Sequence, residues 1–246
     1  GKIAKIDKNY FVSKNTQNFT QLIVINIKEN IIIESDLKLD ISISKSVKWE
    51  PRFFVCSGEN SRSSIQINWN NSLCSINSVF ECYLNQKSYL NLVVTNNGVD
   101  SIDILNYSFQ IEKKAKLKTT FISLGEQILK NDIRINLMDQ KATADIGGLY
   151  VAKFNSIIDY NIKMNHLSKK TLSKQFFRGI LNENSKSSFT GLVKIEKNCI
   201  DSKSEQINNN LLLSDKAHIN SDPQLEIYCN DVECSHGSTV GQFDDD

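Results

Sequence analysis

A thiol, a hydroxyl and an imidazole stand side by side near the end of the chain, as Cys234, Ser235 and His236 in the stretch DVECSHGSTVGQ (231–242). A neighbouring imidazole can take the proton from a thiol or a hydroxyl, so the stretch could hold a Cys–His or a Ser–His nucleophile. A thiolate and an imidazole are also ligands for iron and zinc. The third alternative is that Cys234 is a core residue and His236 is merely adjacent to it.

The direction of each side chain separates these alternatives. On a β-strand, residues i and i+2 share one face with Cα atoms about 6.6 Å apart, so Cys234 and His236 lie together and Ser235 points away. This weakens the Ser–His alternative. A Cys–His nucleophile stays open, because an imidazolium lowers a thiol pKa, yet no protease-type or glutamine-type signature accompanies it. Two ligands do not close a structural metal site, which takes four, so a metal site would need ligands from another subunit.

The other histidines and cysteines carry weaker signals. His166 and His218 are each flanked by polar residues, and we predict surface or corner positions for both. Free cysteines beside apolar residues are usually buried and inert, and we predict this for four of them: Cys56, Cys74, Cys82 and Cys199.

Motifs that bind phosphate or a catalytic metal, or that carry a serine nucleophile, are absent. The chain contains no GxxxxGK[ST], GxGxxG, HExxH or GxSxG pattern. The glycines in LGEQ (Gly125) and DIGGLY (Gly147 and Gly148) are therefore predicted to occupy turns or corners. The acidic cluster Asp244–Asp246 is predicted to be a solvated end.

The elements that must position these residues are strands. Short runs in which apolar and polar residues alternate recur along the chain, for example SIQINW (64–69), YLNLVV (89–94) and DIRINL (132–137). Alternation with a period of two, carried by β-branched residues, predicts strands. A helical pattern is hard to sustain anywhere; the best attempt, residues 118–132, contains Gly125.

The spacing of the strands predicts the architecture. From residue 118 onward the apolar runs return about every 10–13 residues, with polar residues between them. Hairpin signals are scarce, because Asn-Gly occurs once and Asp-Gly never. We therefore predict an all-β, right-handed parallel β-helix, a β-solenoid of roughly 20–25 residues per coil, over a sandwich or a barrel. Residues 1–246 are predicted to form one domain, with residues 1–55 as a less regular start.

Bulk properties exclude several classes of protein. Lys and Arg total 29 against 28 for Asp and Glu, so the net charge is +1, which argues against a nucleic-acid partner. No apolar run reaches the roughly 18 residues that span a bilayer, so no membrane partner is expected. The first residues show no apolar signal-peptide core, and the six cysteines form no CxxC pair. Reduced thiols in a cytosol-like compartment are the better interpretation.

Three stretches resemble one known family. HLSKKTLSKQ (166–175), FFRGILNENSKSSFTGLVKI (176–195) and residues 206–246 together are similar to the core domain of the SufB/SufD family of iron–sulfur cluster assembly proteins. The likeness is dense over residues 166–246 and extends back to about residue 115. The DV-x-CSHG string favours the SufD branch over the SufB branch.

The resemblance implies a fold, partners and a site. The family core is a right-handed parallel β-helix, and the SufD-type and SufB-type subunits pair near the C-terminal ends of their helices. A transient iron–sulfur cluster is attributed to that interface, so the resemblance implies His236 as the residue that faces SufB, Cys234 as the neighbouring thiol, and a metal site completed by the partner. An isolated chain need not bind any cluster. The resemblance also implies the ATPase SufC as a partner, docked on a helical segment that would follow the acidic end and is missing from this chain.

Three functional hypotheses follow. The first is a non-catalytic scaffold subunit of a SufBCD-type complex, placed in the cytoplasm or alternatively in a plastid or apicoplast stroma. The second is a Cys–His thiol hydrolase or transferase on a β-solenoid, and the third is a purely structural β-solenoid. Because the ends of a solenoid expose unpaired strand edges, residues 223–238 are expected at the partner-facing end, and the isolated chain is expected to form a homodimer through it. Within that stretch Cys229 lies seven residues before His236, an odd offset, and is expected to be structural.

Overall fold

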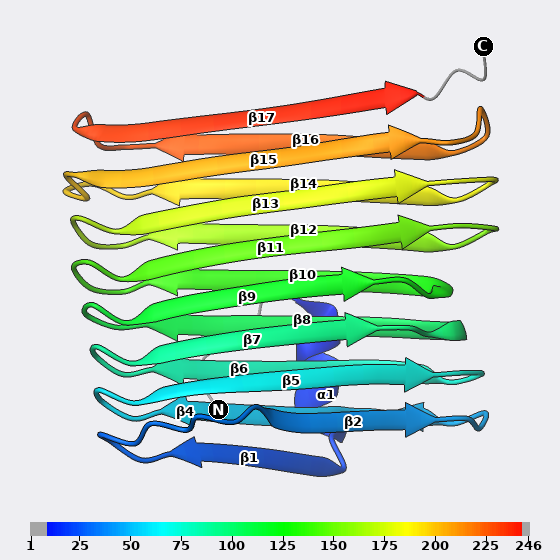
Figure 1. The fold of residues 1–246 in the computed structure, drawn as a ribbon, viewed down its shortest axis with the longest axis horizontal. Coiled ribbons are helices and arrows are strands. Elements are labelled where there is room, and N and C mark those ends of the chain that lie inside the picture. The colour runs from blue at the N-terminus through cyan, green and yellow to red at the C-terminus, as the bar shows by residue number, and fades with distance from the viewer. Residues whose placement is uncertain (1–8, 243–246) are drawn as a thin grey trace.

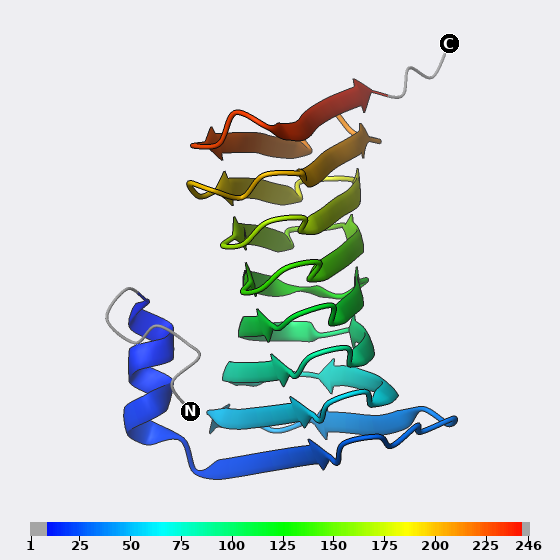
Figure 2. The same cartoon turned by 90° about the vertical axis from the view of Figure 1, so that its left-hand side faces the viewer.

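The chain winds into coils, and the strands of successive coils form two parallel β-sheets that face each other (Figures 1 and 2). The computed structural model describes residues 9–242, and the acidic cluster Asp244–Asp246 lies outside them. All named strand pairings are parallel, as in the register of β10 with β12 and of β15 with β17. The predicted all-β solenoid is confirmed.

Each coil supplies one strand to each sheet, and the short strand β3 adds one more to the nine-stranded sheet just before β4. The nine-stranded sheet contains β1 (Gln21–Ile27), β3 (Lys48–Trp49), β4 (Pro51–Ser57), β6 (Ser75–Leu84), β8 (Val99–Ile111), β10 (Glu126–Leu137), β12 (Ile157–His166), β14 (Lys186–Ile195) and β16 (His218–Ile227). The eight-stranded sheet contains β2 (Leu37–Ile43), β5 (Arg62–Asn71), β7 (Tyr89–Asn96), β9 (Lys116–Ser123), β11 (Thr143–Ala152), β13 (Leu172–Leu181), β15 (Ser202–Leu212) and β17 (Val232–Gln242).

The winding is right-handed. In Figure 1 the strands of the nearer sheet run to the right and those of the farther sheet run to the left as the chain climbs towards its C-terminus. The coils are longer than the 20–25 residues predicted: stacked side chains are 29 residues apart at Lys130 and Asp159 and 31 apart at Ser173 and Ser204. The estimate was short because the strands themselves reach 10 to 13 residues, as in β12 and β8.

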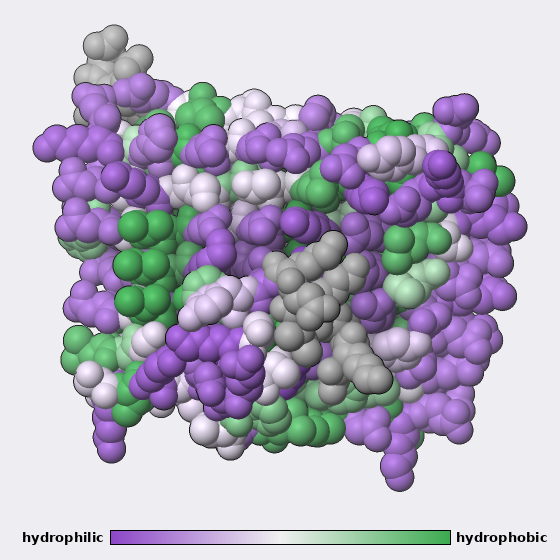
Figure 3. Space-filling view, turned by 180° about the vertical axis from the view of Figure 1, so that it is seen from behind, coloured by the Kyte–Doolittle hydropathy of each residue, from purple (hydrophilic) through white to green (hydrophobic). Residues whose placement is uncertain are grey.

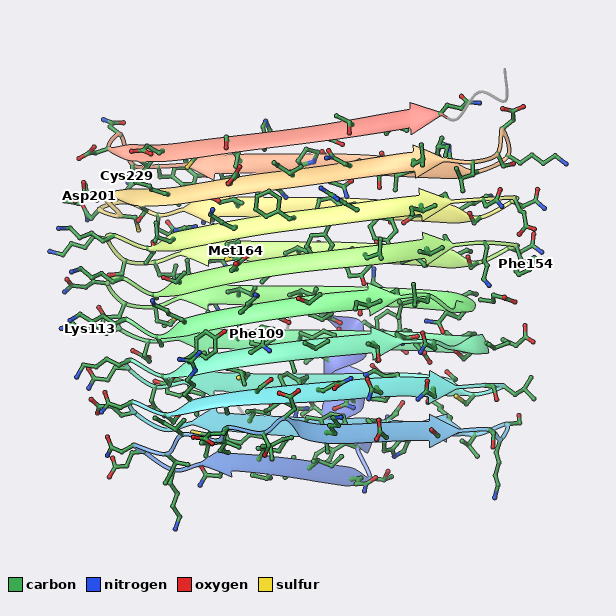
Figure 4. All side chains as sticks on the ribbon, viewed as in Figure 1. Phe109, Lys113, Phe154, Met164, Asp201 and Cys229 are labelled. Atoms are coloured by element: carbon green, nitrogen blue, oxygen red, sulfur yellow. The ribbon has the colours of Figure 1, made fainter. Side chains whose placement is uncertain are left out.

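The core fills the space between the two sheets. Alternate residues of each strand point inward, as the burial of every second residue in β12 and β14 shows. Aromatic rings stack from coil to coil, with centroid distances of 5.3 Å between Tyr160 and Phe177 and between Phe177 and Phe189. Phe109 and Met164 are fully buried in this core, and Figure 4 shows Lys113 and Phe154 at opposite ends of the strands.

One helix, α1 (Tyr10–Asn18), packs on the outside of the nine-stranded sheet (Figure 2). Asn9 caps its first turn by accepting hydrogen bonds from two backbone amides. Arg52 anchors it by donating to the side chains of Asn15 at 3.2 Å and Thr16 at 2.8 Å. The sequence did not predict this helix, because its segment is rich in Asn, Thr and aromatic residues of low helix propensity.

The corners explain why turn signals were scarce in the sequence. Twelve non-glycine residues within 9–242 have a positive φ, and all but Asp100 lie between strands, among them Lys87, Lys114, Lys141 and Lys170. No described glycine has a positive φ, so glycine does not mark the turns. Gly125 lies between β9 and β10, at the corner predicted for it.

The turn prediction for Gly147 and Gly148 is wrong, since both lie within β11. A Cβ at Gly148 would lie 2.3 Å from the ring of Phe177, its register partner on β13. Position 148 therefore has no room for a side chain, because the ring of Phe177 in the next coil occupies the space.

The outer face of the nine-stranded sheet carries an apolar column. Ile102, Ile128 and Ile157 are register partners on three adjacent strands and remain 45, 44 and 42% exposed. Figure 3 is seen from the side opposite to Figure 1 and looks onto the outer face of this sheet. It shows hydrophobic residues stacked near one side of that face. The column is a feature of the middle coils, well separated along the stack from the C-terminal coil.

Candidate functional site at the C-terminal end of the solenoid

The inner face of the last strand holds the thiol and the imidazole. Cys234 and His236 of β17 are in register with Ser204 and Gln206 of β15. Register partners on neighbouring parallel strands point to the same side, and Ser204 and Gln206 are both buried between the sheets. Cys234 and His236 therefore point to the inside of the solenoid, and Ser235 points outward.

Among residues 9–242, no further coil covers the inside at this level. β16 and β17 are the last strands of the two sheets, at the end coloured red in Figure 1. Cys234 is half-buried and packs against the hydrophobic core, whereas His236 is exposed. The two side chains thus line the uncovered end of the interior.

The thiol is not activated in this structure. Burial raises the pKa of Cys234 above its usual value, and a hydrogen bond with the backbone of Ser204 offsets only part of that effect. The thiol is therefore neutral at pH 7. A nucleophilic cysteine needs the opposite shift, so this geometry is unfavourable for the Cys–His nucleophile.

The floor of the open end is polar rather than apolar. The hydroxyl oxygens of Ser173 and Ser204 lie 2.8 Å apart beneath Cys234, and the amides of Gln175 and Gln206 stack beneath His236. Sequence reasoning missed these residues. In the stretch SKSEQINNN (202–210), the odd-numbered and the even-numbered residues are both mostly polar. The sequence pattern therefore does not show which of the two sets faces inward.

A second hydrogen-bond network crosses the interior beside His236. Ser238 of β17 donates to Ser221 of β16 at 2.8 Å, and Ser221 donates to Asn208 at 2.7 Å. Asn208 in turn donates to the hydroxyl of Tyr150 at 3.2 Å. This network joins the two sheets below the opening, so the residues of the last coil are held on a fixed base.

The surface prediction for His166 is wrong. It is the last residue of β12, next to a corner, but its ring points inward and is fully buried. Its Nδ1 lies 2.7 Å from the hydroxyl of Thr171 and its Nε2 lies 2.9 Å from that of Ser173. Burial lowers its pKa to about 4. Hydrogen bonds with these two hydroxyls replace the ones that the buried ring loses with water. The local sequence did not reveal that the ring has these partners.

The other predicted positions fall into three groups. His218 is exposed at the start of β16, as predicted, and is not brought near Cys234 because the two sheets run in opposite directions (Figure 1). Cys74, Cys82 and Cys199 are buried as predicted, whereas Cys56 is only half-buried and faces outward. Cys229 lies in the core, at the corner labelled in Figure 4, as expected for a structural residue.

A metal ion could find only part of a site here. Within residues 9–242, no three His, Cys, Asp or Glu side chains lie close enough together to hold an ion. Cys234 and His236 supply a thiol and an imidazole, so the remaining ligands would have to come from a partner or a substrate. Nor does the described part of the chain contain a helix long and apolar enough to span a membrane.

Comparison with known proteins agrees with this architecture. Residues 41–246 match the family described as SUF system FeS cluster assembly, SufBD core domain. The chain is 32% identical over 123 residues to the iron–sulfur cluster assembly protein SufD of Escherichia coli, covering 50% of this chain and 29% of the relative. It is 24% identical over 260 residues to an iron–sulfur cluster assembly SufBD family protein of Synechocystis, covering 98% of this chain and 57% of the relative.

A third similarity is to the iron–sulfur cluster assembly protein SufD of Plasmodium berghei, 24% identical over 203 residues, covering 80% of this chain and 15% of the relative. The chain thus spans between 15 and 57% of the length of these three relatives. The family match covers most of the solenoid, including the open end with Cys234 and His236. The chain belongs to the SufBD core-domain family of the SUF iron–sulfur cluster assembly system.

Proposed function

We propose that this chain is the SufD-like scaffold subunit of a SufBCD-type complex, and that the nascent iron–sulfur cluster is assembled where its open C-terminal end meets SufB. The observation that carries the proposal is the position of Cys234 and His236 on the inner face of the last described strand, at an end that no coil within residues 9–242 covers. A thiol and an imidazole can both bind iron, and together at this end they make half of a site.

The two side chains have different roles in this proposal. The imidazole of His236 is exposed, so it reaches the interface and can bind iron or donate a proton. The thiol of Cys234 is partly buried and neutral, so it must lose its proton when it binds iron. The cluster itself is cargo, and the proposed scaffold turns over no substrate of its own.

The proposed pairing with SufB uses the edges that the last coil leaves free. β16 and β17 each have one neighbour only, and the inward side chains Ile219, Leu225 and Val232 are only partly covered. A solenoid partner that continues both sheets would cover these edges and side chains together. SufC is the proposed ATPase of the complex, and ATP hydrolysis is assigned to it rather than to this chain.

The two rival functions are less well supported. The raised pKa of Cys234 disfavours a thiol hydrolase or transferase, which needs a ready thiolate. A purely structural solenoid gives no reason for a thiol and an imidazole at the uncovered end. Relatives in Escherichia coli and a chloroplastic relative in Arabidopsis support the cytoplasm or a plastid-type stroma as the proposed compartment.

The test is complementation of a suf-dependent strain by the protein carrying His236→Ala. Loss of an outer-shell partner of a metal ligand costs roughly 10–100-fold, and we expect loss of a direct ligand to lower cluster assembly at least as much. Because the ring is exposed, stability should change by no more than about 1 kcal/mol, and pairing with SufB should persist.

His218→Ala is the matched control, since it removes the other exposed histidine of the chain. It should leave growth and cluster content normal. Normal growth of the His236→Ala strain at equal protein level would show that His236 is structural, and the site assignment would then be withdrawn.

A further inference from the structure

The side chain directly beneath His236 has an unused hydrogen-bond acceptor. Gln206 of β15 is fully buried and is the register partner of His236. Its Oε1 has no hydrogen-bond partner among the residues that the structure describes. A buried amide oxygen without a donor is rare in folded proteins, because the lost hydration is not replaced. A donor from the open end would satisfy it.

The orientation of the Gln206 amide favours a donor from the coil above. Its Nε2 is directed to Oε1 of Gln175 in the coil below, at 3.5 Å, which leaves Oε1 on the other side of the amide group. Of the neighbouring groups on β17, the hydroxyl of Ser238 already donates to Ser221. The thiol of Cys234 is in register with Ser204 instead. A ring N–H of His236 is therefore the donor that the register offers.

Gly191 on the facing sheet makes room for this amide. A Cβ at position 191 would lie 1.7 Å from Nε2 of Gln206. The Gln206 side chain thus crosses the interior as far as the backbone of β14, and the absence of a side chain at Gly191 allows it. The amide therefore lies between Gln175 in the coil below and the backbone of β14 on the facing sheet.

We propose that Gln206 is a positioning residue for His236, whose ring N–H donates to Gln206 Oε1. The hydrogen bond fixes one tautomer of the neutral imidazole. The other ring nitrogen then carries a lone pair and points out of the open end, where it can bind iron or take up a proton. The role of that nitrogen rests on the proposed function, whereas the hydrogen bond does not.

The test reads the tautomer of each histidine by NMR of the chain labelled with 15N-histidine. The chain has three histidines, and two of them are internal references. His166 is held between two hydroxyls, and His218 is exposed and reports the free equilibrium. We expect His236 to be biased towards one tautomer about fivefold more than His218, the factor that corresponds to about 1 kcal/mol for a hydrogen bond.

Two substitutions and a control separate the amide oxygen from the fold. Gln206→Met keeps the size and removes the acceptor, and should return His236 to the ratio of His218. Gln206→Glu restores an acceptor and should retain the bias. Gln175→Met removes an amide from the same column but leaves Oε1 of Gln206 in place, and should also retain it. Unchanged His166 signals show that each variant is folded.

The inference is overturned if His236 has the tautomer ratio of His218 in the wild-type chain, or if Gln206→Met leaves its bias intact. An equal loss of bias in Gln175→Met would also overturn it, because the effect would then belong to the polarity of the column. The proposed function fails separately, when cluster assembly survives His236→Ala while the tautomer bias is present.

Discussion

Single residues inside this solenoid are polar where a core is usually apolar, and some of them have hydrogen-bond partners for every polar atom. His166 is the clearest example, with both ring nitrogens close to hydroxyls and no other ionisable group shifting its pKa. The two hydroxyls satisfy the neutral ring, but they bring no opposite charge to offset the burial of the imidazolium. The fold therefore depends on His166 staying unprotonated.

This dependence predicts a loss of stability in mild acid. The pKa of His166 is about 4 in the folded chain and 6.5 in an unfolded chain, so the unfolded chain binds the extra proton first. The free energy of unfolding should fall as the pH falls from 6.5 to 4, by up to about 3 kcal/mol from this group, and its contribution should level off below 4.

Denaturant unfolding of the wild type and of His166→Asn over this pH range measures the effect. The variant has no titrating ring, so its stability curve should be flatter between pH 6.5 and 4 although it is less stable at pH 7. Parallel curves for the two proteins would show that His166 does not titrate as its burial implies.

At the scale of the strands, stacking places large and small residues opposite each other. Tyr150 is in register with Gly179, as Phe177 is with Gly148. Each ring occupies the space that a side chain of the paired glycine would fill. The strands β11 and β13 can therefore pair at the normal distance with the rings packed between them. The glycines of β11 and β13 are thus packing positions rather than flexible ones.

Replacing such a glycine should destabilise the fold. A Cβ at Gly179 would lie 2.3 Å from the ring of Tyr150, so Gly179→Ala forces a ring or a strand to move. We expect a loss of about 1–3 kcal/mol in the free energy of unfolding, measured by chemical denaturation.

Gly237→Ala is the matched control, because nothing lies within 4 Å of a Cβ built at this position of β17. Its stability should be unchanged or higher by up to about 1 kcal/mol, through the smaller entropy of the unfolded chain. Equal effects of the two substitutions would contradict the packing role of Gly179.

At the scale of the whole molecule, the described strands leave the C-terminal end of the solenoid uncovered. The C-terminal end presents two strand edges and a partly covered interior, which includes Leu225 of β16. Without SufB, a second copy of this chain offers a surface of matching character. We therefore expect self-association through this end.

Leu225→Lys should weaken that self-association at least tenfold, because it places a charge on the inner face of the last coil. Sedimentation velocity over a concentration series measures it, with circular dichroism to confirm folding. Gln224→Lys is the control, since this neighbour on β16 points outward. A wild-type chain that stays monomeric at the highest concentration, or equal behaviour of the two variants, would exclude the C-terminal end as the contact.

The sequence alone predicted the parts of the fold that depend on neighbours along the chain. Alternation of apolar and polar residues predicted strands, their regular spacing predicted a solenoid, and the i, i+2 spacing placed Cys234 and His236 on one face. The resemblance to the SufB/SufD family supplied the expectation of their role, which stays a proposal.

Only the tertiary structure decided what lies beneath those two side chains. Contacts between coils join residues far apart in the chain, for example 29 positions at Lys130 and Asp159 and 31 at Ser173 and Ser204, and a change of one residue at any corner would shift which residues meet. For this reason Gln206 beneath His236, the burial of His166 and the glycines opposite aromatic rings could not be foreseen. A period of two fixes which residues share a face, but the lengths of the corners fix which residue of the next coil each one touches.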